Sequence, residues 1–142
     1  MTLHLIKLCV GVDNIGELAE WQKKKLADLK RKRKPLVLAH VTRMWPRRED
    51  ELLDGGSLYW VIRGQIAVRQ RLLDLREVIK NGAPHCALVL DPKLVPTERR
   101  FHRPFQGWRY FKPSDAPRDL TRRTGAAMPE ELQAELVELG LL

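Results

Sequence analysis

The residues of this sequence that are best able to do chemistry are cations, and they are densest between residues 23 and 34. Eight Lys or Arg side chains fall in these twelve positions, and Asp28 is the one acid among them. Like charges this close repel each other, so a helix carries them most easily where an anion binds, although a solvated helix end also tolerates cations. Both interpretations stay open. The phosphate-binding candidates of this run are Lys30, Arg31, Lys32 and Arg33.

A second group of candidates lies between Thr42 and Arg48, where a tryptophan stands among arginines. An indole in a loop is costly to expose unless it packs or binds a partner. Arginine pairs with phosphates through two parallel hydrogen bonds, and aromatic faces stack on unpaired bases. The binding candidates are Arg43, Trp45, Arg47 and Arg48, with Arg63 on a neighbouring hairpin. In the alternative interpretation, Trp45 closes an edge of the core and its arginines stay solvated.

A third basic stretch, residues 99–123, carries eight basic residues against two acidic ones and is rich in aromatic side chains. Its binding candidates are Trp108, Arg109 and Lys112. Side chains alternate across a strand, so Trp108 and Tyr110 share one face of this segment while Arg109 lies on the other. The alternative interpretation is that the two aromatic side chains only pack the core.

Motifs of enzymes are nearly absent. The sequence contains no phosphate-binding loop, dinucleotide-binding glycine turn, metalloprotease helix motif or nucleophile elbow. We therefore predict no catalytic residue, no metal site and no cofactor. One enzyme hypothesis stays open, a small hydrolase or modifying enzyme acting on a phosphate-bearing or nucleotide substrate. It would use His40 or His102 as acid–base, with Arg43 and Arg109 as clamps.

Composition defines the class of protein that carries these residues. The chain has 142 residues, of which 44% are hydrophobic and 31% charged, and its formal net charge is +8. These values are typical of a soluble globular domain and exclude wholesale disorder or a membrane bundle. The positive charge favours polyanionic partners. Cys9 and Cys86 are too few for a disulfide framework, so we expect free thiols and a cytoplasmic location.

The elements that position these residues are predicted to form a single basic α+β domain over residues 1–142. We expect a basic helix at about residues 15–33, a strand-rich core at 57–111 and a short acidic helix at 129–139. The strands are short and close together. This spacing predicts a mainly antiparallel, curled or barrel-like sheet with peripheral helices.

Two segments have a less certain pattern. Residues 69–79 fit either a strand or a helix, and the alternation favours a strand to about Leu73. Three prolines fall within residues 92–105, which predicts an extended, largely irregular loop there.

Four segments of the sequence resemble an uncharacterised family of alphaproteobacterial proteins, the domain-of-unknown-function family 1489. They are residues 3–11, 51–62, 87–92 and 105–110, and the Gly-Gly-Ser-Leu-Tyr-Trp-Val-Ile run within 51–62 is rather specific. The resemblance implies a single-domain bacterial cytoplasmic protein and brings no activity, cofactor or catalytic residue. A weaker likeness, at the level of fold alone, is to RNA-binding barrels of the PUA type.

The basic stretches and their aromatic neighbours favour a nucleic-acid-binding domain that acts away from membranes, with RNA a better partner than DNA. The enzyme described above is one alternative. The other is a protein-interaction module that uses the acidic C-terminal helix, whose carboxylates contrast with the basic body of the protein.

Overall fold

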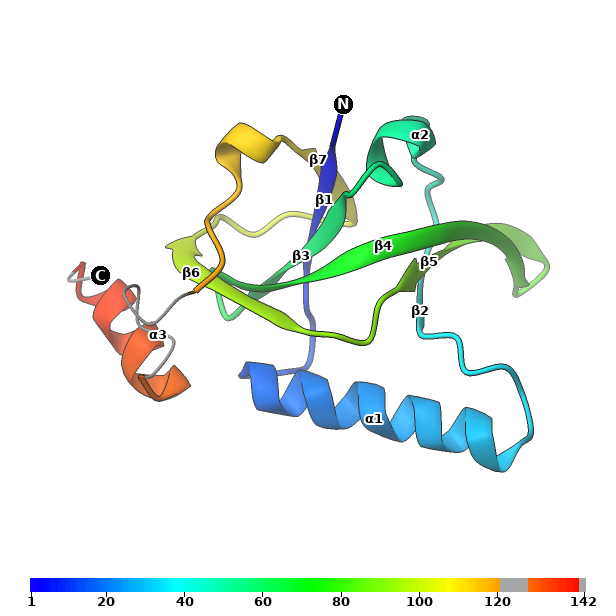
Figure 1. Ribbon diagram of the computed structural model, residues 1–142, viewed down its shortest axis with the longest axis horizontal. Helices are drawn as coiled ribbons and strands as arrows, with labels where there is room; N and C mark the ends of the chain where they lie inside the picture. Colours follow the sequence, from blue (N-terminus) through cyan, green and yellow to red (C-terminus); the bar gives the residue numbers. More distant parts are fainter. Residues whose placement is uncertain (121–127, 141–142) are drawn as a thin grey trace.

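A computed structural model describes residues 1–120 and 128–140, which fold into one mixed sheet with helices packed around it (Figure 1). The strands are β1 (His4–Leu8), β2 (Ala39–Thr42), β3 (Ser57–Ile62), β4 (Gln65–Lys80), β5 (Ala83–Leu90), β6 (Val95–Phe101) and β7 (Trp108–Phe111). The helices are α1 (Ile15–Arg31), α2 (Glu49–Leu52) and α3 (Glu130–Glu138), and a 3-10 turn, η1, spans Pro113–Asp115. The predicted α+β class is confirmed.

The sheet has seven strands, and its order is β2-β5-β4-β3-β1-β7, with β6 paired to β4 outside this path. β1 runs parallel to β3, whereas the other pairings are antiparallel. β4 is a long strand shared by three neighbours. Its first half pairs with β3 and β6, and its second half pairs with β5. Register shifts in all three pairings give the sheet its bends.

The sheet curls but does not close into a barrel. Among the residues that the structure describes, β2 and β7 are the two ends of the strand order and do not pair with each other. Of the two predicted forms of the sheet, curled or barrel-like, the structure therefore has the curled one, because backbone pairing does not close it. Side chains join the two edges instead, because Trp108 and Tyr110 of β7 bond to the loop that follows β2.

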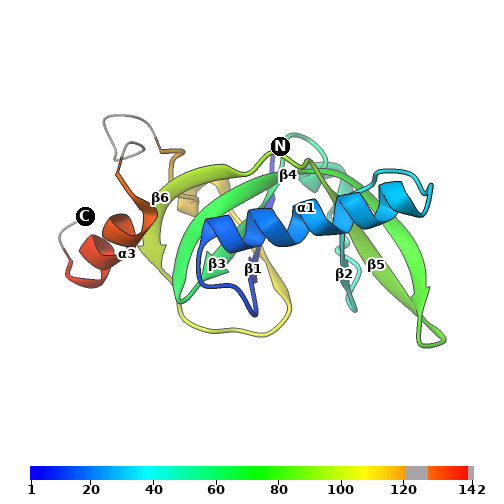
Figure 2. The same cartoon turned by 90° about the horizontal axis from the view of Figure 1, so that it is seen from below.

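Helix α1 crosses one face of the sheet (Figure 2). Its start agrees with the sequence, because Asn14 Oδ1 accepts a hydrogen bond from the Glu17 N–H at 2.8 Å and caps the first turn. The helix ends at Arg31, two residues before the predicted end. Arg33 has a φ of 56° there, and the Lys34 N–H bonds back into the last turn, which closes the helix in a Schellman-type cap.

A buried amide network joins α1 to the sheet. Gln70 of β4 is fully buried and forms a reciprocal pair of hydrogen bonds with Gln22 of α1, at 2.8 and 2.9 Å. Its Oε1 also accepts from Trp60 Nε1 at 2.8 Å, and its Nε2 also donates to the Asp91 carbonyl at 3.0 Å. Every polar atom of the Gln70 side chain has a hydrogen-bond partner. The hydrogen bonds therefore compensate the free-energy cost of removing this amide from water.

Apolar side chains pack on both faces of the sheet. The face under α1 carries the larger cluster, which includes Leu5, Leu18, Leu58, Trp60 and Leu88. The opposite face carries a smaller cluster formed by Ile6, Tyr59, Val61, Ile66 and Phe111. Successive residues of β1 and β3 alternate between these two clusters, as the pleat of a strand requires. The two faces are therefore chemically distinct environments for the candidate residues.

The β3–β4 hairpin confirms the clearest strand prediction. β3 is buried throughout and pairs with β4, with Tyr59 opposite Arg69 and Trp60 opposite Val68. Residues 69–79 are strand throughout, because β4 continues to Lys80. The helix alternative for this segment was wrong, since pairing with β5 overrides its helical periodicity.

Strand β6 corrects the prediction of an irregular loop at residues 92–105. It pairs with the first half of β4 and contains Pro96, opposite Val68. A proline is compatible with this strand because β6 is an edge strand, where not every backbone N–H is needed for pairing. Helix α3 lies beside β6 (Figure 1). No helix in residues 1–120 and 128–140 combines the length and the apolar character needed to cross a membrane.

Candidate nucleic-acid interface

The loop between β2 and α2, residues 43–48, is held against β7 by two aromatic side chains. Trp108 Nε1 donates a hydrogen bond to the Met44 carbonyl at 2.8 Å. The Tyr110 hydroxyl accepts hydrogen bonds from the backbone N–H groups of Arg47 and Arg48, at 2.8 and 3.2 Å. The Trp108 and Tyr110 rings pack edge to face with 4.9 Å between their centroids. These bonds fix the backbone of a loop that has no regular secondary structure.

This fixed loop presents large side chains to the solvent. We call its outward residues the loop surface: Arg43, Met44, Trp45, Arg47 and Arg48. The Met44 side chain is 68% exposed and Trp45 is 39% exposed, between arginines that are all exposed. Arg48 is ion-paired with Glu51 and lies over the Tyr110 ring. Arg43 and Arg47 form no ion pair with any residue that the structure describes.

A lysine of β1 lies next to Trp108, and a histidine lies next to Trp60 on the same face of the sheet. Lys7 of β1 is the cross-strand neighbour of both Trp60 and Trp108, so these side chains share a face of the sheet. His40 of β2 packs edge-on against Trp60, with 5.1 Å between the ring centroids. Burial, reinforced by the charge of Lys7 and other lysines, lowers the pKa of His40 to about 4. Burial also lowers the pKa of Lys7.

The charges around His40 come from three different elements. They belong to Lys7 of β1, Lys25 of α1 and Lys80 of β4. Lys25 Nζ donates to the Ala39 carbonyl at 2.9 Å, and none of the three lysines has an ion-pair partner within residues 1–120 and 128–140. A group of cations without a neighbouring carboxylate creates a positive potential that attracts an anion. Sequence reasoning missed this group, although a lysine inside the apolar β1 segment was an available signal.

The predicted phosphate-binding run at the end of α1 is separate from the loop surface. β2 lies between them, so the chain passes from the end of α1 along β2 before it reaches residues 43–48 (Figure 1). The four candidates there, Lys30, Arg31, Lys32 and Arg33, are all exposed. Arg31 and Lys32 both bind the Asp28 carboxylate, which reduces the local positive charge.

The other predicted residues divide between the two faces and the two ends of the sheet. Trp108 joins the loop surface, as described above. Arg109 faces the opposite side of the sheet, where its guanidinium lies 5.4 Å from the centroid of the Phe105 ring. Arg63 occupies the β3–β4 turn with a φ of 50°, at the end of β3 that is remote from α2. Lys112 is exposed directly after β7. The structure therefore does not gather the predicted residues into one groove.

The two histidines that the enzyme hypothesis offers as alternative acid–base groups lie on opposite faces of the sheet. His40 packs on Trp60, on the α1 side of the sheet, whereas His102 packs on Phe105, on the opposite side. Burial raises the pKa of both Cys9 and Cys86 to about 11, so neither thiol is activated as a nucleophile. Residues 1–120 and 128–140 contain no group of three side chains able to ligate a metal ion.

Comparison with known protein families assigns the chain to a family. The family described as "Protein of unknown function (DUF1489)" matches residues 5–142, a range that includes the loop surface, β7 and α3. No curated protein and no solved structure matches the sequence. The match extends over nearly the whole chain, in agreement with the resemblance of the four segments named above. The chain belongs to the DUF1489 family of proteins of unknown function.

Proposed function

We propose that this protein binds single-stranded nucleic acid, RNA in preference to DNA, through the loop surface. The observation that carries the proposal is the partly exposed Trp45, which lies on a loop fixed by β7. It is flanked by Arg43 and Arg47, which have no ion-pair partner within residues 1–120 and 128–140. An aromatic face that stacks on a base, flanked by guanidinium groups that bind phosphates, is the usual composition of a single-strand binding surface.

The fixed backbone of the loop supports this function energetically. Ordering a free loop upon binding costs free energy for each side chain and residue that becomes immobile. The hydrogen bonds from Trp108 and to Tyr110 hold the loop before any ligand arrives. The proposal also gives a role to the lysines around His40, which would attract the phosphates of a strand that passes Trp108. Cytoplasmic RNA is the partner that we propose.

The test is a titration of a short fluorescein-labelled single-stranded RNA, followed by fluorescence anisotropy at two salt concentrations. The double variant Arg43→Ala/Arg47→Ala should weaken binding and should flatten the dependence of log K on log salt by about 1.4, because each phosphate contact on a single strand contributes about 0.7. The matched control, Arg63→Ala/Arg109→Ala, removes the same number of arginine charges away from the loop surface and should change binding little.

Two outcomes would contradict the proposal. One is an equal loss of RNA affinity in Arg43→Ala/Arg47→Ala and in Arg63→Ala/Arg109→Ala. That result would show that binding depends only on the net charge of the protein. The other is absence of RNA binding by the wild-type protein at low salt. A DNA strand of the same sequence tests the preference for RNA, because weaker binding of DNA is expected if the 2′-hydroxyl is recognised.

A further inference from the structure

A carboxylate of the C-terminal helix occupies the start of α1. Glu130 of α3 accepts hydrogen bonds from the Ile15 backbone N–H with both oxygens, at 2.7 and 3.0 Å. Ile15 is the first residue of α1, so its N–H has no partner within the helix and lies at the positive end of the helix dipole. The same Glu130 carboxylate binds Arg99 Nη2 at 2.5 Å. Donors from two elements, α1 and β6, thus converge on one carboxylate of a third, α3.

Arg99 is built into this site and does not lie on the surface. Its side chain is 4% exposed, and its Nη1 donates to the buried Gln65 Oε1 at 3.3 Å. The Gln65 Nε2 in turn donates to the Ala134 carbonyl of α3 at 3.1 Å. Arg99 Nε is buried and has no hydrogen-bond partner among residues 1–120 and 128–140. A buried guanidinium with an unpaired N–H is costly unless a further acceptor binds there.

We propose that the start of α1, Arg99 and Gln65 form a binding site for a phosphate-sized oxyanion, and that Glu130 is its internal ligand when no such anion is bound. The site offers the Ile15 N–H, the Arg99 guanidinium and, once α3 is displaced, the Gln65 amide. A helix N-terminus combined with a fork of guanidinium donors matches the geometry and charge of a phosphate. Glu130 binds part of this donor set and leaves Arg99 Nε without a hydrogen-bond partner among the described residues.

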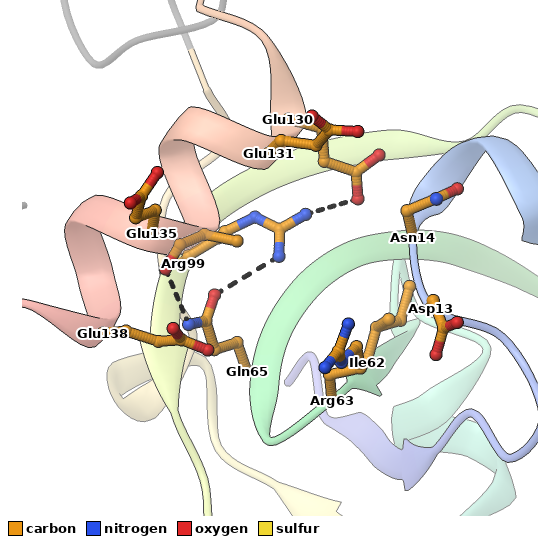
Figure 3. Close-up of a pocket in the computed structure, with 11 residues that line it drawn as sticks. Asp13, Asn14, Ile62, Arg63, Gln65, Arg99, Glu130, Glu131, Glu135 and Glu138 are labelled. Carbon is orange, nitrogen blue, oxygen red and sulfur yellow. Dashed lines mark hydrogen bonds and ion pairs between the residues drawn. The ribbon is translucent and has the colours of Figure 1, made fainter.

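The adjoining cavity indicates the class of ligand. It has a volume of about 460 Å³ and extends from Arg99 to Asp13 and Arg63, with Glu131 and Glu135 on the α3 side (Figure 3). This space is large enough for the body of a small molecule. The carboxylates of Glu131 and Glu135 would repel a second or third phosphate group on the same ligand. The ligand we infer is therefore a small phosphate monoester whose remainder is neutral or cationic, which makes this site distinct from the proposed RNA-binding loop surface.

Inorganic phosphate tests the site directly, because it carries the recognised group alone. We expect phosphate to bind Glu130→Ala at least roughly tenfold more tightly than it binds Glu131→Ala in calorimetric titrations against a chloride blank of equal ionic strength. Glu131 is the matched control, because it is an exposed acid in the same helical turn without the contacts to Ile15 and Arg99. In nitrogen-15 NMR spectra the Ile15 amide signal should move with phosphate in Glu130→Ala.

The double variant Arg99→Ala/Glu130→Ala should lose this phosphate binding. If Glu130→Ala does not fold, Glu130→Gln keeps the shape of the side chain while removing its charge, and the same order of affinities is expected. The proposal is overturned if the Glu130 and Glu131 variants respond alike to phosphate. It is also overturned if phosphate binds without moving the Ile15 amide signal, or if removing Arg99 leaves the affinity unchanged.

Discussion

At the scale of single residues, a substitution of Trp45 distinguishes a role in RNA binding from a role in core packing. Trp45 is 39% exposed, whereas Trp60 in the core is 3% exposed. Replacing Trp45 by Ala should therefore cost about 1–3 kcal/mol of RNA binding through lost base stacking, with little change in the salt dependence. The melting temperature should change little, because Trp45 is 39% exposed and belongs to neither apolar cluster of the described residues. Titration of labelled RNA and thermal unfolding check both expectations, and a large fall in melting temperature with unchanged binding would assign Trp45 to the core.

His40 makes the stability of the fold depend on pH. Its pKa is about 4 in the folded protein and about 6.5 in an unfolded chain, so protonation favours unfolding. The stability that the neutral histidine gives is fully present above about pH 6.5 and is lost as the pH falls toward 4. Between about pH 7 and pH 5 this loss should amount to about 2 kcal/mol. Urea unfolding of wild type and His40→Asn measures it, and equal pH slopes in both proteins would contradict this account.

The buried amide of Gln70 should stabilise the fold, because it joins α1, β3 and β4 through hydrogen bonds. Gln70→Ala leaves Trp60 Nε1 and the Gln22 side chain without their buried partners. We expect a loss of about 2–3 kcal/mol in the free energy of unfolding, measured with urea. Gln106→Ala is the matched control, because Gln106 is exposed in the chain before β7 and should cost less than about 0.5 kcal/mol. Similar losses in the two variants would show that the network contributes little.

At the scale of elements, Gly56 allows the end of α2 to pass beside β1. A Cβ atom at this position would lie 2.2 Å from the Leu3 carbonyl oxygen and 2.3 Å from that of Leu52. Both obstacles are backbone atoms, so the α2–β3 connection must move to accept a side chain. We expect Gly56→Ala to lower the free energy of unfolding by more than about 3 kcal/mol in urea denaturation.

Gly16→Ala is the control for this prediction. The new Cβ would meet only the Asn14 Oδ1 atom, at 3.2 Å, and that atom belongs to a side chain that can adjust. A helical alanine is also intrinsically favourable compared with glycine. Gly16→Ala should therefore be nearly neutral. An equally small change in the free energy of unfolding for Gly56→Ala would contradict the close approach of Gly56 to the backbones of Leu3 and Leu52.

Local patterns predicted the elements whose structure is decided locally. The Asn14 cap and its spacing to Glu17 located the start of α1, and the aromatic and β-branched run of β3 identified the central strand. β6 was missed because the three prolines of residues 92–105 disfavour regular structure. The one that lies within β6, Pro96, is compatible with a strand only because β6 is at an edge of the sheet. Likewise, β4 is strand to Lys80 because β5 pairs with it, which periodicity alone does not reveal.

The candidate site was predictable in its parts but not in its assembly. Arginines around Trp45 and the aromatic face of Trp108 were both visible in the sequence. Their contact was not, because Met44 and Trp108 are 64 positions apart and meet only through the curl of the sheet. Strand alternation already placed Arg109 on the other face from Trp108. The remote position of Arg63 follows from the direction of β3, which leads away from α2.

At the scale of the whole molecule, the open sheet separates the two anion-binding regions that we propose. Its curl brings the loop after β2 to β7, which forms the loop surface, while α3 and the start of α1 lie at the other end of the molecule (Figures 1 and 2). The net charge of +8 supplies general attraction for nucleic acid. In the proposed function, specific placement of a nucleic-acid strand comes from Trp45 and its neighbours. The two regions should therefore respond independently to substitution.

Nitrogen-15 NMR of the tryptophan indoles is the most direct test of the central claim, that the loop surface binds RNA. The chain has four tryptophans, and they sample different regions: Trp21 on α1, Trp45 in the loop, Trp60 in the core and Trp108 on β7. On addition of unlabelled single-stranded RNA, we predict that the Trp45 indole signal moves most, followed by that of Trp108, while that of Trp21 stays in place. Binding that moves Trp21 and leaves Trp45 unchanged would contradict the account.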